Sequence, residues 1–225
     1  MSATIILGCH RSGTSLVAGL YHNAGVIMGT EFKPAPSEEN PLGFFEDWNG
    51  RKINDAILEK EGYVVKDWST TIPKINTDDR EQRLVLKHYI NQRGQSKQWG
   101  FKDPRLCLTW QAWNRMLPIN TKYIFVFRHP LSVANSLANR DGISFNTGLD
   151  IWYEYNRRAL GVLREPHSGI VSYESIINKE YLPVFDYKKL VKYDLNRSLP
   201  SGELPRKHAS LFTHLKVLER SIGNG

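Results

Sequence analysis

The sequence predicts an α/β protein of three layers, with a central parallel sheet and helices on both faces. Four short segments rich in β-branched and aromatic residues have the composition of buried strands: 4–7, 98–102, 122–127 and 170–173. Apolar residues recur at helical spacing between them, and strands that alternate with helices favour a parallel sheet with right-handed crossovers. The length of 225 residues suits one domain, expected to cover residues 1–225.

The expected helices follow apolar residues that recur every three or four positions. They contain the segments 16–24, 53–58, 84–90, 130–137, 152–160 and 211–222. Pro130 suits the first turn of its helix, where the missing N–H is not needed. Two long irregular stretches, 30–43 and 196–206, contain several prolines and glycines, and stretches of this length are either functional loops or disordered.

The charge balance points to an anionic partner. Thirty Lys and Arg against 23 Asp and Glu give a net charge of +7 and an isoelectric point near 9.4. The basic residues are scattered rather than gathered in a run of like charges, and most Trp and Tyr residues lie in apolar periodic segments. Nucleic acid is therefore not the expected partner.

The cysteine content and the N-terminal segment bear on the compartment. Cys9 and Cys107 are too few for a disulfide framework, and neither has neighbours at the spacing of zinc ligands. The apolar stretch 3–7 is too short for a signal peptide or a membrane span. The sequence thus predicts a cytoplasmic protein with no membrane span.

A loop with the sequence GCHRSGTS, residues 8–15, lies between the first strand and the first helix. In this position, backbone N–H groups and the helix N-terminus converge on an anion. Gly8 and Gly13 have the spacing of a P-loop, but Thr14 replaces the lysine that reaches the β- and γ-phosphates of a nucleoside triphosphate. Arg11 supplies a cation from a different direction. A glycine-rich turn without a ligand is the alternative.

The missing lysine disfavours a nucleoside triphosphatase, and the sequence also offers no obvious magnesium ligand. No hydrophobic run ends in an aspartate of the kind that a phosphoryl-transfer site uses. A sulfuryl group carries less charge than a phosphoryl group, so its transfer would not need the metal. No metal site is therefore expected.

Three motifs, in this order and each at a strand end, together resemble those of sulfotransferases that use 3′-phosphoadenosine 5′-phosphosulfate (PAPS). They are the loop 8–15, GFKDPR at 100–105 and FVFRHPLSVANS at 125–136, and the resemblance spans about residues 4–178. The chain looks most like small bacterial sulfotransferases, with loop and Lys-Asp-Pro features similar to tyrosylprotein sulfotransferases.

This resemblance implies a P-loop-containing domain that transfers a sulfuryl group from PAPS, in line and without metal, to a hydroxyl or amine. The acceptor would be a small molecule, a glycan or a peptide, and the second product adenosine 3′,5′-bisphosphate. Two alternatives stay open: a nucleotide or small-molecule kinase, and a catalytically inactive nucleotide-binding module of the same fold. The sequence does not indicate the oligomeric state.

The resemblance also assigns the donor-binding residues. The 5′-phosphosulfate loop corresponds to Arg11, Ser12, Gly13, Thr14 and Ser15. Arg11 would stabilise the phosphate oxygen that gains charge when the S–O bond breaks. The family's 3′-phosphate site corresponds to Arg128 and to Ser136 eight residues later, with Arg140 on the same helix face, although the last two also suit a plain helix surface.

Three further positions follow from the resemblance. Lys102 corresponds to the lysine that steadies the leaving group, although it could instead form a structural ion pair with its neighbour Asp103. Tyr173 corresponds to a tyrosine near the nucleotide or is a core residue at a strand end. The stretch 196–206 lies about where the family closes a segment over the 3′-phosphate, which makes Arg197, Arg206 and Lys207 candidates.

The general base has three candidates, because the acceptor hydroxyl must give its proton to a carboxylate or a histidine. Glu46 is the first, since its segment 40–47 resembles a recurring element of the small bacterial enzymes. Glu31 lies twenty residues after Arg11, close to the position of the glutamate in the tyrosylprotein enzymes. His10 adjoins the loop and is the third.

Overall fold

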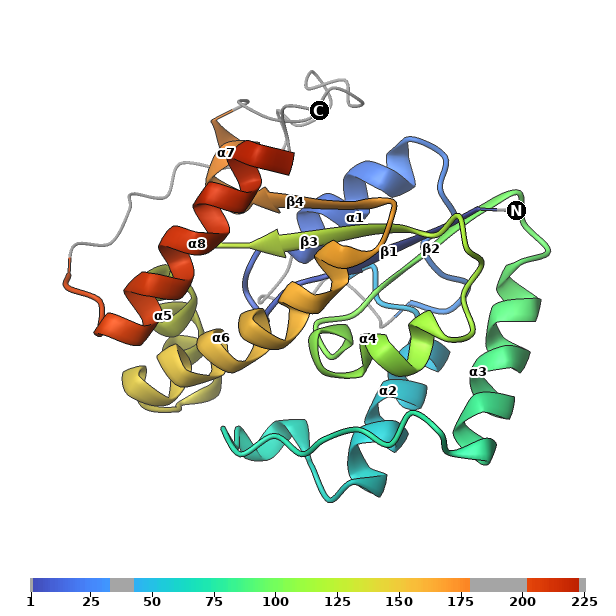
Figure 1. Ribbon diagram of the computed structural model, residues 1–225, viewed down its shortest axis with the longest axis horizontal. Helices are drawn as coiled ribbons and strands as arrows, with labels where there is room; N and C mark the ends of the chain where they lie inside the picture. Colours follow the sequence, from blue (N-terminus) through green and yellow to red (C-terminus); the bar gives the residue numbers. More distant parts are fainter. Residues whose placement is uncertain (1, 33–42, 179–201, 223–225) are drawn as a thin grey trace.

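The computed structural model describes residues 2–32, 43–178 and 202–222, and its centre is a four-stranded parallel sheet. The order is β2-β1-β3-β4 (Figure 1), with bounds β1 Ser2–Leu7, β2 Gln98–Lys102, β3 Lys122–Phe127 and β4 Ser168–Ser172. The predicted parallel sheet is confirmed. The fourth strand ends one residue earlier than predicted, because Tyr173 begins a helix instead.

All six predicted helices are present. They are α1 Thr14–Asn23, α2 Trp48–Lys60, α3 Arg80–Arg93, α5 Pro130–Asp141, α6 Phe145–Ala159 and α8 Arg206–Ile222. Pro130 occupies the first turn of α5 as expected. None of the helices in the described part of the chain has the length and apolar character needed to cross a membrane.

Several helical segments were not predicted: α4 (Leu106–Asn114), α7 (Tyr173–Ile177) and the 3₁₀ turns η1 (Val65–Asp67) and η2 (Leu160–Arg164). Seven of the nine residues of α4 are buried. A helix that is buried nearly all round has no polar face, so its sequence lacks the periodic pattern on which the prediction depends.

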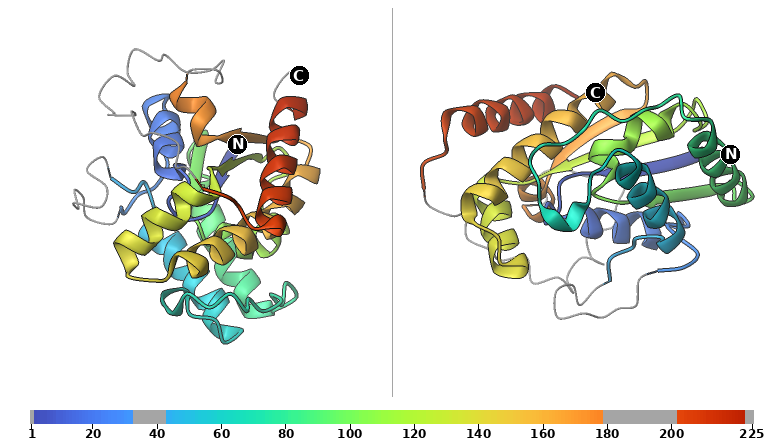
Figure 2. Two further views of the ribbon diagram at one scale, coloured as in Figure 1. Left: turned by 90° about the vertical axis from the view of Figure 1, so that its left-hand side faces the viewer. Right: turned by 90° about the horizontal axis from the view of Figure 1, so that it is seen from below.

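The sheet is the middle of three layers, as the sequence predicts. Successive strand residues point to opposite faces. Ile5 and Phe125 pack on one face with residues of α2, α3, α4, α6 and α8, whereas Ile6 and Val126 pack on the other face with α1 and α7. The left view of Figure 2 accordingly shows α1 and α8 on opposite sides of the sheet.

The strand order places a topological switch point between β1 and β3. The chain that leaves β1 returns to the sheet as β2 on one side, whereas β3 leads to β4 on the other side. Ligands of open parallel sheets bind at the carboxyl ends of the strands at such a point. Gly8 lets the chain leave β1 close to β3 here, since a Cβ on Gly8 would lie 2.1 Å from the carbonyl oxygen of Val126.

Candidate active site

The loop between β1 and α1 has the backbone of an anion-binding loop. Arg11 and Gly13 both have left-handed conformations, with φ of 63° and 89°. Gly13 is the N-cap of α1, and no side chain among the described residues caps the helix there. Uncapped N–H groups and the helix dipole attract a negative ligand. A side chain at position 13 would also collide with Tyr173, because a Cβ there would lie 2.5 Å from the ring.

Ser12 adds a buried hydroxyl to this loop. Its backbone N–H donates to the carbonyl of Cys9 at 3.1 Å, which closes the turn. Its Oγ is buried and has no hydrogen-bond partner among the described residues. A buried hydroxyl without a partner is rare in folded proteins, and here it lies beside a helix N-terminus that has no side-chain cap. An anion in the loop would satisfy both groups.

Residues predicted for the two ends of the donor nucleotide are in contact at the carboxyl ends of β1 and β3. Arg11 donates from Nε to the hydroxyl of Ser136 at 2.8 Å, and Arg128 donates from Nη1 to the carbonyl of Arg11 at 3.3 Å. The Arg128 guanidinium lies over the ring of Tyr173, 4.5 Å from its centroid. The motifs after β1, β3 and β4 therefore form one continuous set of contacts.

The turn that carries Arg128 is itself held by neighbouring elements. The indole N–H of Trp152 donates to the carbonyl of Arg128 at 2.9 Å, and the backbone N–H of His129 donates to Glu174 at 3.0 Å. Helix α6 and the start of α7 thus fix the direction in which Arg128 leaves β3.

Arg140 lies on the same helix as Ser136 but makes its contacts elsewhere. Its Nη2 pairs with Asp141 at 2.7 Å, and its guanidinium lies 5.9 Å from the ring centroid of Trp68. Trp68 in turn packs edge-on against His10, with ring centroids 5.2 Å apart. The structure therefore places Arg140 beside His10 and Trp68.

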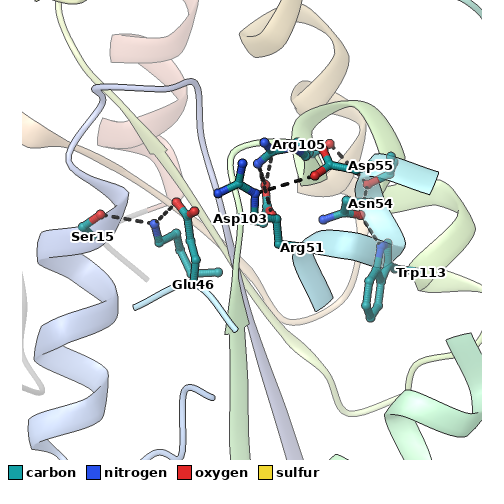
Figure 3. Close-up of polar contacts among 10 residues, drawn as sticks. Ser15, Glu46, Arg51, Asn54, Asp55, Asp103, Arg105 and Trp113 are labelled. Carbon is teal, nitrogen blue, oxygen red and sulfur yellow. Dashed lines mark hydrogen bonds and ion pairs between the residues drawn. The ribbon is translucent and has the colours of Figure 1, made fainter. Parts of the chain in front are cut away.

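At the carboxyl end of β2, Lys102 lies in an ion pair that is almost completely buried. Its Nζ is 2.7 Å from Oε1 of Glu46 and 3.1 Å from Oγ of Ser15, as Figure 3 shows for the two labelled partners. The side chain of Lys102 is 1% exposed. Asp103, the neighbour considered as its partner, instead pairs with Arg105 at 3.1 Å.

The ion pair decides the protonation state of Glu46. Burial raises the pKa of its carboxyl, but the charge and hydrogen bond of Lys102, with smaller contributions from Arg105 and Arg51, outweigh burial and lower the pKa below its ordinary value. Glu46 is therefore a carboxylate at neutral pH, as a general base must be.

Asp47 holds Glu46 in place. It is fully buried, and its Oδ1 accepts the N–H of Gly50 at 3.1 Å, which caps α2. Its Oδ2 accepts the N–H of Thr30 at 2.8 Å. Arg105 also contacts α2, because its Nε pairs with Oδ1 of Asp55 at 2.5 Å. Figure 3 shows Arg105 and Asp55 near the ion pair of Glu46.

The other two candidates for the base lie in different surroundings. Glu31 is exposed, and its carboxylate accepts a hydrogen bond from Asn49 at 3.4 Å. The His10 ring packs between Trp68 and Tyr155, where burial and the charges of Arg105 and Arg140 lower its pKa well below the ordinary value. Of the three candidates, Glu46 is the one in contact with Lys102.

The three candidates from the C-terminal part of the chain also lie in different surroundings. Arg197 lies outside the described residues, and Arg206 is exposed at the start of α8. Lys207 pairs with Asp150 of α6 at 2.5 Å.

No separate role was predicted for Asp47 or Arg105, whereas Trp68 lies in the segment 63–79 that was expected to line the acceptor site. An aspartate directly before an apolar periodic segment is a known helix-start signal, and it would have identified Asp47. Arg105 has no comparable local signal.

Comparison with solved structures identifies a similar fold. The sulfotransferase domain of the Synechococcus PCC 7002 olefin synthase aligns with a TM-score of 0.54 and 15% identity, over 96% of this chain and 94% of that domain. Retinol dehydratase, in a complex with retinol and PAP, aligns with a TM-score of 0.36 and 14% identity, over 96% of this chain and 64% of its own. No protein-family model and no curated protein sequence matches the chain. The first alignment confirms that the chain has the fold of a sulfotransferase domain.

Proposed function

We propose that the protein transfers a sulfuryl group from PAPS to a hydroxyl or amine of an acceptor. One observation carries the proposal: the loop after β1 contacts Ser136 and Arg128 on one side and Lys102 on the other. The fold of a sulfotransferase domain supports the same reaction class. PAPS would supply a sulfuryl group already activated by its bond to a phosphate leaving group.

The residues present suit the two charged ends of this donor. The N-terminus of α1 and the buried hydroxyl of Ser12 offer donors for the 5′-phosphosulfate. Arg128, just before α5, and Ser136, in the middle of α5, suit a 3′-phosphate, because a guanidinium and a hydroxyl can donate to the same phosphate. Tyr173 closes this side of the loop by packing on Gly13.

Glu46 and Lys102 would then have different roles: Glu46 would accept the proton, and Lys102 would stabilise the negative charge of the leaving group. Glu46 accepts the proton that the acceptor hydroxyl loses as its oxygen bonds to sulfur. Lys102, together with Arg11, stabilises the electron pair that remains on the phosphate oxygen when the S–O bond breaks. Because the charge and hydrogen bond of Lys102 lower the pKa of Glu46, any movement of Lys102 toward the phosphate oxygen would raise the basicity of the carboxylate.

Ligand-dependent thermal unfolding tests the donor class. Adenosine 3′,5′-bisphosphate should raise the melting temperature, and Arg128→Ala should remove most of that rise, whereas Arg83→Ala, on an exposed part of α3, should leave it intact. Transfer of labelled sulfate from PAPS to a panel of hydroxyl and amine acceptors then tests turnover. A shift with ATP and Mg²⁺ but none with the bisphosphate would replace the sulfotransferase with a kinase.

A further inference from the structure

Helix α8 contacts the two strand ends that precede Arg128 and Tyr173. Phe127 and Ser172 are the last residues of β3 and β4, so each lies directly before one of these two site residues. Figure 1 shows α8 beside the carboxyl ends of both strands. The helix therefore lies next to the parts of the backbone from which the Arg128 guanidinium and the Tyr173 ring, 4.5 Å apart, enter the site.

A buried glutamate of α8 makes the contact with β4. Glu219 is 3% exposed, and its Oε1 accepts the backbone N–H of Ser172 at 2.6 Å. Its Oε2 pairs with Nζ of Lys216 at 2.5 Å, and the same Nζ donates to Oγ of Ser172 at 3.1 Å. Burial raises the pKa of Glu219, but the hydrogen bonds from Lys216 and Ser172 outweigh burial and lower the pKa below its ordinary value. Two residues of α8 thus hold Ser172 through its backbone and its side chain.

Ser172 determines how the chain enters α7. It is the N-cap of this helix, and its Oγ accepts the N–H of Ser175 at 3.2 Å. Tyr173 is the first residue of α7, so the direction of its side chain depends on this cap. The fit of its ring is close, because a Cβ on Gly13 would lie 2.5 Å from the ring and the guanidinium of Arg128 lies over it. A change in the position of Ser172 would therefore disturb both contacts.

The same helix also contacts the end of β3. The ring of Phe212 packs edge-on against those of Phe127 and His129, with centroids 6.2 and 4.8 Å apart. The backbone N–H of His129 donates to Glu174 of α7 at 3.0 Å. Helix α8 therefore contacts the residues on both sides of Arg128, and α7 links the ends of the two strands.

We propose that Glu219 is a positioning residue of the donor site, which holds the end of β4 so that Tyr173 keeps Arg128 in place for the nucleotide. The proposal rests on the proposed function and extends it to a buried carboxylate outside the residues expected to touch the donor. Glu219 acts through Ser172, whose N–H it accepts, and not through a contact of its own with the nucleotide.

Calorimetric titration with adenosine 3′,5′-bisphosphate, well below the melting temperature of each variant, tests this role. Glu219→Ala leaves the N–H of Ser172 without its acceptor and should weaken binding about tenfold. Leu215→Ala is the matched control, because Leu215 is fully buried and lies one turn earlier on α8. It should lower the melting temperature but leave the dissociation constant within about twofold of the wild-type value.

A double-mutant cycle separates positioning from a general loss of stability. If Glu219 acts through the ring of Tyr173, Glu219→Ala should weaken binding by less than about twofold when Tyr173→Leu is already present. Lys216→Met/Glu219→Leu removes the ion pair as a whole and still deprives Ser172 of its acceptor, so it should weaken binding as much as Glu219→Ala. It takes the place of Glu219→Ala if the alanine variant does not fold.

Wild-type affinity in the Glu219 variants would overturn the proposal. An equal loss of affinity in Leu215→Ala would also overturn it, because any disturbance of α8 would then have the same effect. A tenfold loss that persists in the Tyr173→Leu background would show that Glu219 does not act through the ring. Failure of the proposed function is a different result, since the wild-type protein itself would then not bind the bisphosphate.

Discussion

The lysine and arginine side chains on the two sides of the loop after β1 have different kinds of partner. On the β2 side, which comprises Ser15, Glu46, Lys102, Asp103 and Arg105, each cation pairs with a carboxylate: Lys102 with Glu46 at 2.7 Å and Arg105 with Asp103 at 3.1 Å. On the β3 side, which comprises Arg11, Arg128, Ser136 and Tyr173, the cations contact a hydroxyl, a carbonyl and an aromatic ring.

The partners described for the cations on the two sides therefore differ in charge: carboxylates on the β2 side, and a hydroxyl, a carbonyl and an aromatic ring on the β3 side. Most of the β2 side is also more deeply buried: only Ser15 is half-buried there, whereas on the β3 side only Arg128 is buried. A buried ion pair contributes little net stability, but removal of one partner leaves a charge without compensation. Substitutions on the β2 side should therefore affect folding, and those on the β3 side should affect binding.

The largest expected effect is that of Lys102→Met, which leaves the buried carboxylate of Glu46 without its closest cation. The free energy of unfolding should fall by about 3–5 kcal/mol in urea denaturation at neutral pH. The double variant Lys102→Met/Glu46→Gln should regain much of the loss, because no charge then remains to be compensated. Ser136→Ala, on the β3 side, should cost about 1 kcal/mol or less. If the Lys102 and Ser136 variants lose similar amounts of unfolding free energy, the two sides do not differ in their contribution to folding.

The pH dependence of stability is the next effect in size. The pKa of Glu46 is lower in the folded protein than its ordinary value of 4.5, so the carboxylate stabilises the fold above that value and the contribution is lost as the pH falls through the folded pKa. Urea unfolding of the wild type and of Glu46→Gln should therefore differ at neutral pH, and the difference should shrink below about pH 4.5. A difference that is constant with pH would mean that Glu46 is not ionised in the pair.

Local patterns were enough to predict the sheet. The bounds of β2 and β3 agree with the predicted segments 98–102 and 122–127, because buried parallel strands are short apolar runs between polar residues. The loop 8–15 was predicted from its glycines and flanking elements, and it does connect β1 to α1. Helix α4 was missed because burial on nearly all sides removes the pattern that identifies a surface helix.

The contacts within the site join residues that are far apart in the sequence, so no local sequence pattern could predict them. Glu46 and Lys102 are 56 positions apart, and they meet because Asp47 caps α2 and ties it to Thr30. The neighbour Asp103 was a reasonable partner for Lys102 on sequence alone. However, consecutive residues leave an extended strand in opposite directions, so Asp103 turns to Arg105 instead. The contact of Arg11 with Ser136 depends on a positive φ that nothing in an arginine signals.

The smallest expected effect belongs to Glu31→Gln, and it tests whether the base lies on the β2 side. Glu31 is exposed and bonded to Asn49, so the substitution should change the turnover number for sulfuryl transfer by about twofold at most. Glu46→Gln should lower it by about a hundredfold or more while calorimetry shows the bisphosphate bound as before. Both variants keep the shape of the side chain and remove its charge, so they form a matched pair. If Glu31→Gln abolishes turnover and Glu46→Gln does not, the Lys102 pair is purely structural, and the base lies in the segment that Asp47 holds through Thr30.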